Sequence, residues 1–383
     1  MTRADERRAI VIGAGIGGLS AAVALRRAGW AVAVYERARV IRPEGAALWL
    51  WPNAVAAVER LGVGAAVAAF AAPQAVSGIR DGRGRVLVSV PLPVLERRLG
   101  YAALAIRRAA MHRVLHAALP PGTVRLNATC ADVTHDANAA TAHFADGTHA
   151  HGDVVIVADG MFSALRGRLL GAAPPHYTGY TTWHGMTTYP HAHLPTGESW
   201  GRGERFGVAA LDDGNVHWIG VFNCATKGMM PVEGPKAMLA ARFAAWPAPI
   251  PALIAATDEA AILRSDVYDA SPLPRWGAGR VTFLGDAAHP MTPNLGQGAC
   301  MAIEDAVVLA QCLAHRRDVI AGLRRYERVR MRRTAAVNWK LRTYGQVAQW
   351  THPLARAVRD GILRSIPMAV HHEGLSRMIG PAV

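Results

Sequence analysis

The sequence has 383 residues, of which 51% are hydrophobic and 18% charged, a balance typical of an ordered globular chain that is long enough for two domains. The formal net charge is +14, but the basic residues are scattered and no basic block contains interleaved aromatics, so we expect no nucleic-acid partner. The four cysteines lack the spacing of metal sites, which indicates thiols in a reducing cytoplasm and no bound metal. The N-terminus leads straight into a predicted strand, and we expect no transmembrane helix.

A glycine-rich turn follows the first predicted strand, residues 9–12 (AIVI), and precedes a helical pattern. In this G-x-G-x-x-G spacing Gly13 permits the tight turn, Gly15 lets a pyrophosphate approach the backbone, and Gly18 packs the helix on the strand. The next predicted strand, residues 31–35, ends at Glu36, whose carboxylate can accept both hydroxyls of an adenosine ribose. The pattern indicates a dinucleotide site without deciding which dinucleotide binds.

Two later motifs have the same strand-then-carboxylate design. Residues 154–158 (VVIVA) predict a buried strand that ends at Asp159, and residues 281–284 predict another that leads through Gly285 to Asp286. A carboxylate after a buried strand can accept a hydrogen bond from a ribose or ribityl hydroxyl. The turn at Gly296-Gln297-Gly298 then begins a helix whose N-terminus suits the negative charge of a reduced flavin.

Three motifs carry a resemblance to a known family: the GxGxxG of residues 13–18, the DG of residues 159–160 and the GDAAHP of residues 285–290. Together they resemble the motifs of the class A flavoprotein monooxygenases, the single-component aromatic hydroxylases. The resemblance covers roughly residues 8–330 and is nearest to urate hydroxylase, the salicylate- and hydroxybenzoate-type hydroxylases and alkylquinolone hydroxylase. It implies an α/β fold with a discontinuous Rossmann-like FAD-binding domain, an inserted β-sheet substrate domain and a C-terminal helical segment. The implied boundaries are 1–75, 100–175 and 265–320 for the FAD domain, 76–99 and 176–264 for the substrate domain, and 321–383 for the helices.

The resemblance also implies roles for individual residues. Gly13, Gly15, Gly18 and Glu36 would hold the ADP half of FAD, Arg108 would reach the pyrophosphate, and Asp159 would lie near the pyrophosphate and the nicotinamide path. Asp286 would bind the ribityl chain, and the 290–298 loop, with Pro293, Gly296, Gln297 and Gly298, would lie against the isoalloxazine. NADH or NADPH would reduce the flavin, and a C4a-hydroperoxide formed with O2 would hydroxylate an aromatic or heteroaromatic substrate.

The substrate side is less determined. Residues 216–221 alternate as in a strand that covers a pocket. By resemblance to urate hydroxylase Arg205 belongs to the active site, although a solvated hairpin arginine fits the pattern equally well. His217 falls where that subgroup carries a tyrosine, which puts urate in doubt, and an ordinary strand histidine is the alternative for it. Further pocket candidates are Trp49, Trp51, Asn53, Trp183 and His184.

In the C-terminal segment Leu354, Val358, Ile362 and Ile366 repeat every four residues, which predicts an amphipathic helix. We expect it to pack on the flavin domain; the alternative is a weak membrane-surface contact.

Five other functions use part of the pattern. A flavin-dependent epoxidase or reductase differs from a hydroxylase only in substrate and oxygen reactivity. A nicotinamide dehydrogenase would leave the DG and GDAAHP segments without a role. A flavin halogenase would carry a WxWxIP motif, which is missing here, and a flavin-bound scaffold without activity is the last alternative.

Overall fold

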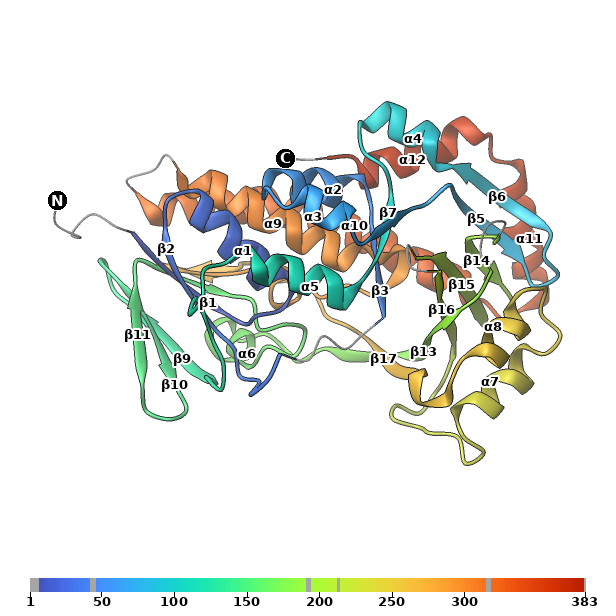
Figure 1. The fold of residues 1–383 in the computed structure, drawn as a ribbon, viewed down its shortest axis with the longest axis horizontal. Coiled ribbons are helices and arrows are strands. Elements are labelled where there is room, and N and C mark those ends of the chain that lie inside the picture. The colour runs from blue at the N-terminus through green and yellow to red at the C-terminus, as the bar shows by residue number, and fades with distance from the viewer. Residues whose placement is uncertain (1–6, 42–45, 191–193, 212–213, 315–317, 382–383) are drawn as a thin grey trace.

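A computed structural model of the chain describes residues 7–41, 46–190, 194–211, 214–314 and 318–381. The elements form two regions, one built on a parallel sheet and one on a larger, mostly antiparallel sheet (Figure 1). The predicted fold class is confirmed.

The first region contains a six-stranded sheet that is parallel except at one edge. Its order is β18 (Gly277–Ala278), β19 (Val281–Phe283), β12 (Val154–Val157), β1 (Arg8–Ile12), β2 (Ala31–Tyr35) and β8 (Val124–Arg125). The central strands are buried on both faces, which explains why their sequences are continuous apolar runs. All four strands predicted for this sheet are present.

Helices cover this sheet and pack on one another. The covering helices are α1 (Ile16–Arg27), α2 (Pro52–Arg60), α3 (Gly64–Ala68), α5 (Arg108–Ala117), α6 (Ala164–Leu170) and α9 (Gln297–Ala314). Two three-stranded sheets flank them, β9 (Cys130–His135), β10 (Ala140–Phe144) and β11 (His149–Gly152), and β3 (Ala47–Leu50), β4 (Ala71–Pro73) and β7 (Leu104–Arg107).

The second region is a seven-stranded sheet. Its order is β17 (Leu263–Asp269), β13 (His176–Thr188), β16 (Asn215–Asn223), β15 (Glu204–Ala210), β14 (Gly197–Trp200), β5 (Val76–Asp81) and β6 (Val86–Pro91). The predicted segments 76–99 and 176–264 therefore contribute to one sheet. Strand β17 runs past the predicted boundary at residue 264, and we propose that the substrate domain extends to Asp269.

The large sheet has two different faces because side chains alternate along each strand. In β16, Trp218 and Phe222 join the apolar cluster formed with α7 (Pro235–Phe243) and α8 (Ile250–Ala256). His217, Ile219 and Val221, which alternate with these residues along the strand, line a cavity on the opposite face. One face thus builds a core and the other faces the cavity.

Three helices follow, α10 (Val319–Ala348), α11 (Pro353–Ser365) and α12 (Met368–Ile379), and α4 (Leu92–Leu99) lies beside the last (Figure 1). Helix α10 packs on α9 and reaches the large sheet, where the Tyr344 hydroxyl donates to Glu198 at 3.0 Å. The expected packing of the apolar stripe on the flavin domain is wrong for three of its four residues, and the fourth, Ile366, is partly buried and lines the cavity. Helix α11 packs against β6, and Leu354, Val358 and Ile362 are 67%, 53% and 55% exposed.

Among the described residues, the segment Asn294–Ala314 alone is long and apolar enough to cross a membrane, by length and composition only. Of its most apolar stretch of 18 residues, 78% is buried inside the fold, where α9 packs between α1, α2 and α10. Its apolar composition is explained by its place in the core.

Candidate active site

The glycine-rich turn joins β1 to α1, and its three glycines meet different demands. Gly13 has a φ of +104°, and a Cβ there would lie 2.4 Å from the Ala158 carbonyl oxygen. A Cβ on Gly18 would lie 1.9 Å from the Gly13 carbonyl oxygen, whereas one on Gly15 would meet no atom within 4 Å. Gly13 and Gly18 are therefore required by packing, while Gly15 leaves open space at the α1 N-terminus, as a bound pyrophosphate needs.

Glu36 lies directly after β2 and beside this turn. One of its carboxylate oxygens accepts from the backbone N–H of Ala14 at 2.8 Å and the other from that of Ala38 at 2.9 Å. These two bonds fix the carboxylate next to the α1 N-terminus, and the remaining lone pairs can accept from ribose hydroxyls.

Asp159 and Asp286 follow the neighbouring strands β12 and β19, whose carboxyl ends lie at one edge of the sheet. Burial raises the pKa of both carboxyl groups. The Oδ1 atom of Asp159 is buried and has no hydrogen-bond partner among the described residues. An acceptor in that position fits a cofactor that carries hydroxyl groups.

Arg166 of α6 ties these two turns together. Its guanidinium donates to the Asp286 carbonyl oxygen at 3.2 Å and to the Met161 carbonyl oxygen at 2.7 Å. Ser163 caps α6 by accepting from the Arg166 N–H at 3.0 Å. Ser163 and Arg166 follow Asp159 closely in the sequence, but the contact between Arg166 and Asp286 spans 120 residues and has no local signal.

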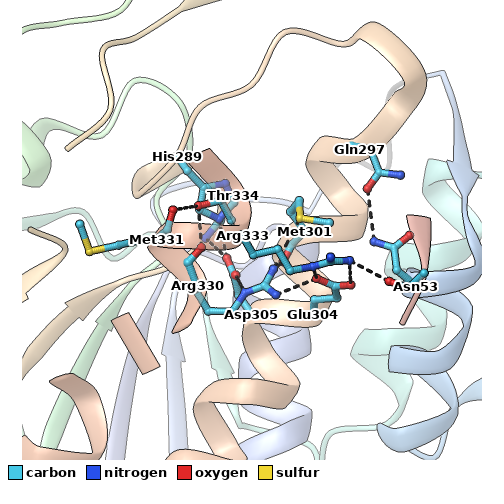
Figure 2. A network of polar contacts seen from close by, with 12 residues as sticks. Asn53, His289, Gln297, Met301, Glu304, Asp305, Arg330, Met331, Arg333 and Thr334 are labelled. Atoms are coloured by element: carbon cyan, nitrogen blue, oxygen red, sulfur yellow. Dashed lines mark hydrogen bonds and ion pairs between the residues drawn. The ribbon is translucent and has the colours of Figure 1, made fainter. Parts of the chain in front are cut away.

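A buried ionic network holds the turn that carries Asp286. Asp305 accepts from the Gly285 N–H at 3.1 Å, from His289 Nε2 at 2.6 Å and from Arg330 Nε at 2.5 Å (Figure 2). Burial by itself would raise the pKa of Asp305, but His289 and Arg330 outweigh it and lower the pKa to about 2. Since Asp305 stays ionised, it fixes the backbone of the turn and orients His289.

The same arginine extends the network along α9. Arg330 Nη1 donates to Glu304 at 2.7 Å, and Arg333 binds both oxygens of Glu304 at 2.7 Å (Figure 2). Gln297, at the start of α9, accepts from Asn53 Nδ2 at 3.2 Å. Glu304 and Asp305 of α9 therefore clamp this helix to α10.

The loop from Pro290 to Gly298 has a strained backbone at its centre. Leu295 and Gly296 both have positive φ, +58° and +63°, and a non-glycine residue rarely adopts such a value. Trp51 Nε1 donates to the Leu295 carbonyl oxygen at 2.6 Å and holds this conformation. Pro293, Gly296 and Gly298 line the cavity, so the strain lies at its wall.

The cavity between the two regions has a volume of about 1380 Å³. Arg108, Asp286 and the 290–298 loop line it from the side of the parallel sheet, while His184, Arg205 and His217 line it from the large sheet. Six of the predicted cofactor residues do not line the cavity: Gly13, Gly15, Gly18, Glu36, Asp159 and Gln297. Most of them surround the α1 N-terminus, beyond the cavity. The volume suffices for a ring system together with a small organic ligand.

Arg205 lies inside the site and is not a solvated hairpin residue, because it is 2% exposed. Its guanidinium is 3.3 Å from Glu198 and donates to the Asn294 side chain in the 290–298 loop. Burial lowers the pKa of Arg205, but the Glu198 carboxylate more than compensates and raises it, so the cation is kept. Glu198 and Tyr344 were missed by the sequence reasoning, and Asn294 was included only as part of the 290–298 loop. The contacts Tyr344–Glu198 and Arg205–Asn294 join residues 146 and 89 positions apart, so no local pattern reveals them.

The other pocket candidates do not all reach the cavity. Trp49, Trp51 and His184 line the cavity. Trp183 lies on the opposite face, in the cluster with α7 and α8, and Asn53 is buried against Gln297. Strand alternation explains the difference between the adjacent residues 183 and 184.

Comparison with known proteins agrees with this geometry. The model of a family described as FAD binding domain matches residues 6–203 and 259–339. The aurachin C monooxygenase/isomerase of Stigmatella aurantiaca is 40% identical over 364 residues, which are 93% of both chains. An FAD-dependent urate hydroxylase of Klebsiella pneumoniae is 36% identical over 92% of this chain and 94% of that protein.

A solved structure extends the similarity to three dimensions. Klebsiella pneumoniae HpxO complexed with FAD and uric acid superimposes with a TM-score of 0.91 at 34% identity, covering 98% of each chain. The open glycine turn, the unpartnered acceptor of Asp159 and the buried Asp286 are compatible with a bound FAD. The chain therefore belongs to the family defined by this FAD-binding domain and is an FAD-dependent monooxygenase of the aromatic hydroxylase type.

Proposed function

We propose that this monooxygenase hydroxylates an electron-rich aromatic or heteroaromatic ring, with NADH or NADPH as the reductant and O2 as the source of oxygen. The observation that carries the proposal is the single cavity that Asp286 and Pro293 line from one side and Arg205 and His217 from the other. A ring held there would lie between the flavin loop and the polar side chains of the large sheet.

The geometry supports the following cofactor roles. Gly15 and the α1 N-terminus would bind the pyrophosphate with help from Arg108, and Glu36 would bind the ribose. Asp286, whose side chain faces Gly298 at the start of α9, would accept from the ribityl chain. The 290–298 loop, with Pro293, would lie against the ring system of the flavin. Bound FAD supplies the redox chemistry, taking electrons from the nicotinamide and activating oxygen.

Arg205 would orient the substrate. Its bonds to Glu198 and Asn294 leave further N–H donors of the guanidinium for an oxygen atom of the ring substituent. Because the bond to Asn294 joins β15 to the 290–298 loop, Arg205 would also set the distance between substrate and flavin. A positioning error of about 1 Å can cost roughly a hundredfold in rate.

The remaining lining excludes water. Trp49, Ile219, Val221 and Val267 give the cavity apolar walls, which strengthen the electrostatic interactions inside it and protect reactive species from water. The substrate is expected among phenols, purines and quinolones. By the resemblance drawn from the sequence, His217 falls where urate hydroxylase carries a tyrosine, which puts urate itself in doubt.

We further propose a weak contact between α11 and a membrane surface. The exposed Leu354, Val358 and Ile362 form an apolar stripe, and Arg364 on the same helix is exposed in a chain of net charge +14. A cytoplasmic location stays a prediction; no two of the four cysteines, all described by the structure, are joined in a disulfide.

The test is a screen of phenols, purines and quinolones with the purified flavoprotein. We expect at least one ring to stimulate NADH or NADPH oxidation together with O2 consumption and to yield a product heavier by one oxygen atom. An epoxide product, or nicotinamide oxidation that no ring stimulates, contradicts the proposal. A protein that is colourless and takes up no added FAD contradicts the assignment of the cofactor as well.

A further inference from the structure

We propose that His184 sets the tautomer of His217, so that His217 presents a hydrogen-bond acceptor to the cavity and the enzyme prefers rings with an O–H or N–H donor at that point. The inference rests on the proposed function for its substrate class. The chain of hydrogen bonds from Thr182 through His184 to His217, called the histidine relay below, can be tested without any substrate.

The two histidines lie on the cavity face of the paired strands β13 and β16. Nδ1 of His184 is 3.3 Å from Nε2 of His217. The rings are inclined by only 18°, and their centroids are 5.5 Å apart, farther than the facing nitrogens. The imidazoles therefore meet edge to edge, as a hydrogen bond in the ring plane requires, and not face to face.

Thr182 gives this contact a direction. Its hydroxyl donates to the Ser265 carbonyl oxygen at 3.0 Å, and Nε2 of His184 is 3.2 Å from the same hydroxyl oxygen. A carbonyl oxygen can only accept and a hydroxyl has one proton, so all contacts are satisfied only if His184 donates to Thr182 through Nε2. Nδ1 of His184 then carries a lone pair and accepts from Nε2–H of His217.

The second nitrogen of His217 follows from this order. With its proton on Nε2, a neutral His217 has a bare Nδ1, and that atom has no hydrogen-bond partner among the described residues. Burial lowers the pKa of His184 to about 4, and burial with a smaller effect of His184 lowers that of His217 to about 3. Both rings stay neutral near pH 7, so Nδ1 of His217 accepts a hydrogen bond but does not keep the proton.

The selectivity follows from desolvation. A bound ring with a donor at this point satisfies Nδ1, whereas a ring with a methoxy or N-methyl group leaves a buried acceptor unpaired. His184, which does not need to touch the substrate, is a positioning residue in this scheme. His217 is the specificity-determining one.

The first test is nuclear magnetic resonance of the FAD-loaded protein with ¹⁵N-labelled histidine, since ring nitrogens with and without a proton have distinct shifts. The signals of the two residues are identified by their loss in His217→Gln and His184→Gln. We expect a proton on Nε2 of both rings at pH 7. A proton on Nδ1 of His217 overturns the inference, whatever the substrate proves to be.

The Thr182→Val variant probes the anchor of the relay. Because valine keeps the shape but not the hydroxyl, we expect a mixture of tautomers at His217. The matched control is Thr141→Val, which removes a hydroxyl 2.8 Å from Nδ1 of the exposed His151 and should leave His217 unchanged. An unchanged His217 in a folded, FAD-loaded Thr182→Val protein contradicts the proposed role of Thr182.

The second test compares 3-hydroxyquinoline with 3-methoxyquinoline by their effect on the flavin spectrum. We expect the hydroxyl compound to bind wild-type protein at least about tenfold more tightly and the difference to shrink in His217→Phe and Thr182→Val. Equal or reversed affinities in the wild type overturn the selectivity. Failure of every ring to stimulate nicotinamide oxidation would instead count against the proposed function, which the tautomer measurement does not depend on.

Discussion

Arg205 in β15 donates a hydrogen bond to Asn294 in the loop before α9, across 89 residues of sequence. Asn294 in turn donates to Thr292 at 2.9 Å and to the Leu341 carbonyl oxygen of α10 at 2.9 Å. The side chains of the large sheet and the 290–298 loop are therefore one connected unit, and substitutions at Arg205 should affect catalysis more than folding of the FAD-binding domain.

We expect Arg205→Gln to keep bound FAD but to lower the yield of hydroxylated product at least about tenfold, because the substrate loses a charged donor and the loop loses its tie. The measurement is product formed per nicotinamide oxidised. Arg202→Gln, on an exposed residue of the same hairpin, is the control and should behave as wild type. Full product yield from Arg205→Gln would contradict the role of this arginine.

Asp286→Ala should purify largely without flavin, since the buried carboxylate beside Gly298 is the proposed ribityl contact. The ratio of flavin to protein absorbance measures the effect. Asp258→Ala, which removes an exposed carboxylate, serves as the control. Stoichiometric FAD that survives dilution to micromolar protein would show that the contact is elsewhere.

Arg330→Met should lower the free energy of unfolding by about 3–5 kcal/mol, because it leaves the buried carboxylates of Glu304 and Asp305 without a common cation. Urea titration gives the value. Arg377→Met breaks the exposed pair with Glu373 and should change stability little. Equal losses in the two variants would mean that burial is not what makes the network matter.

Acid should destabilise the protein through the two cavity histidines. Their ordinary pKa is 6.5, while in the folded state it is about 4 for His184 and about 3 for His217. As pH falls below 6.5, the unfolded chain binds protons that the folded one does not, and each histidine lowers the free energy of unfolding by at most about 1.4 kcal/mol per pH unit.

The loss of stability continues until the pH falls to the pKa values of the folded state, and at pH 7 there is no such loss. Below pH 6.5 the free energy of unfolding should therefore fall less steeply with pH in the double variant His184→Phe/His217→Phe than in wild type. Unfolding measured at several pH values gives this slope, called the acid limb. The exposed His151→Phe should leave the limb as it is. A double variant with the wild-type slope would contradict the depressed pKa values.

The membrane contact predicts that the protein co-sediments with vesicles of phosphatidylglycerol and phosphatidylcholine, more weakly as salt is raised. Val358→Glu/Ile362→Glu should abolish this, because it places charges in the apolar stripe of α11. Val329→Glu, at an exposed valine of α10, is the control. Sedimentation that is unaffected by the double substitution would place the contact elsewhere.

The features that were predictable from the sequence are local. The strands at residues 9–12, 31–35 and 281–283 and the glycine turn after the first of them follow from short apolar runs and from the steric demands of Gly13 and Gly18. Each of these signals is complete within about a dozen neighbouring residues, so chain order alone reveals them.

What the tertiary structure decided are relationships between distant segments. Whether Arg205 is solvated or buried, which nitrogen of His217 meets His184, and that Asp305 meets Arg330 all depend on contacts across sheets and helices. The outward apolar stripe of α11 belongs to the same class, since periodicity shows that a helix has an apolar face but not what covers it. Local sequence determines the conformation of a segment, while the solvation and partners of its side chains are properties of the assembled fold.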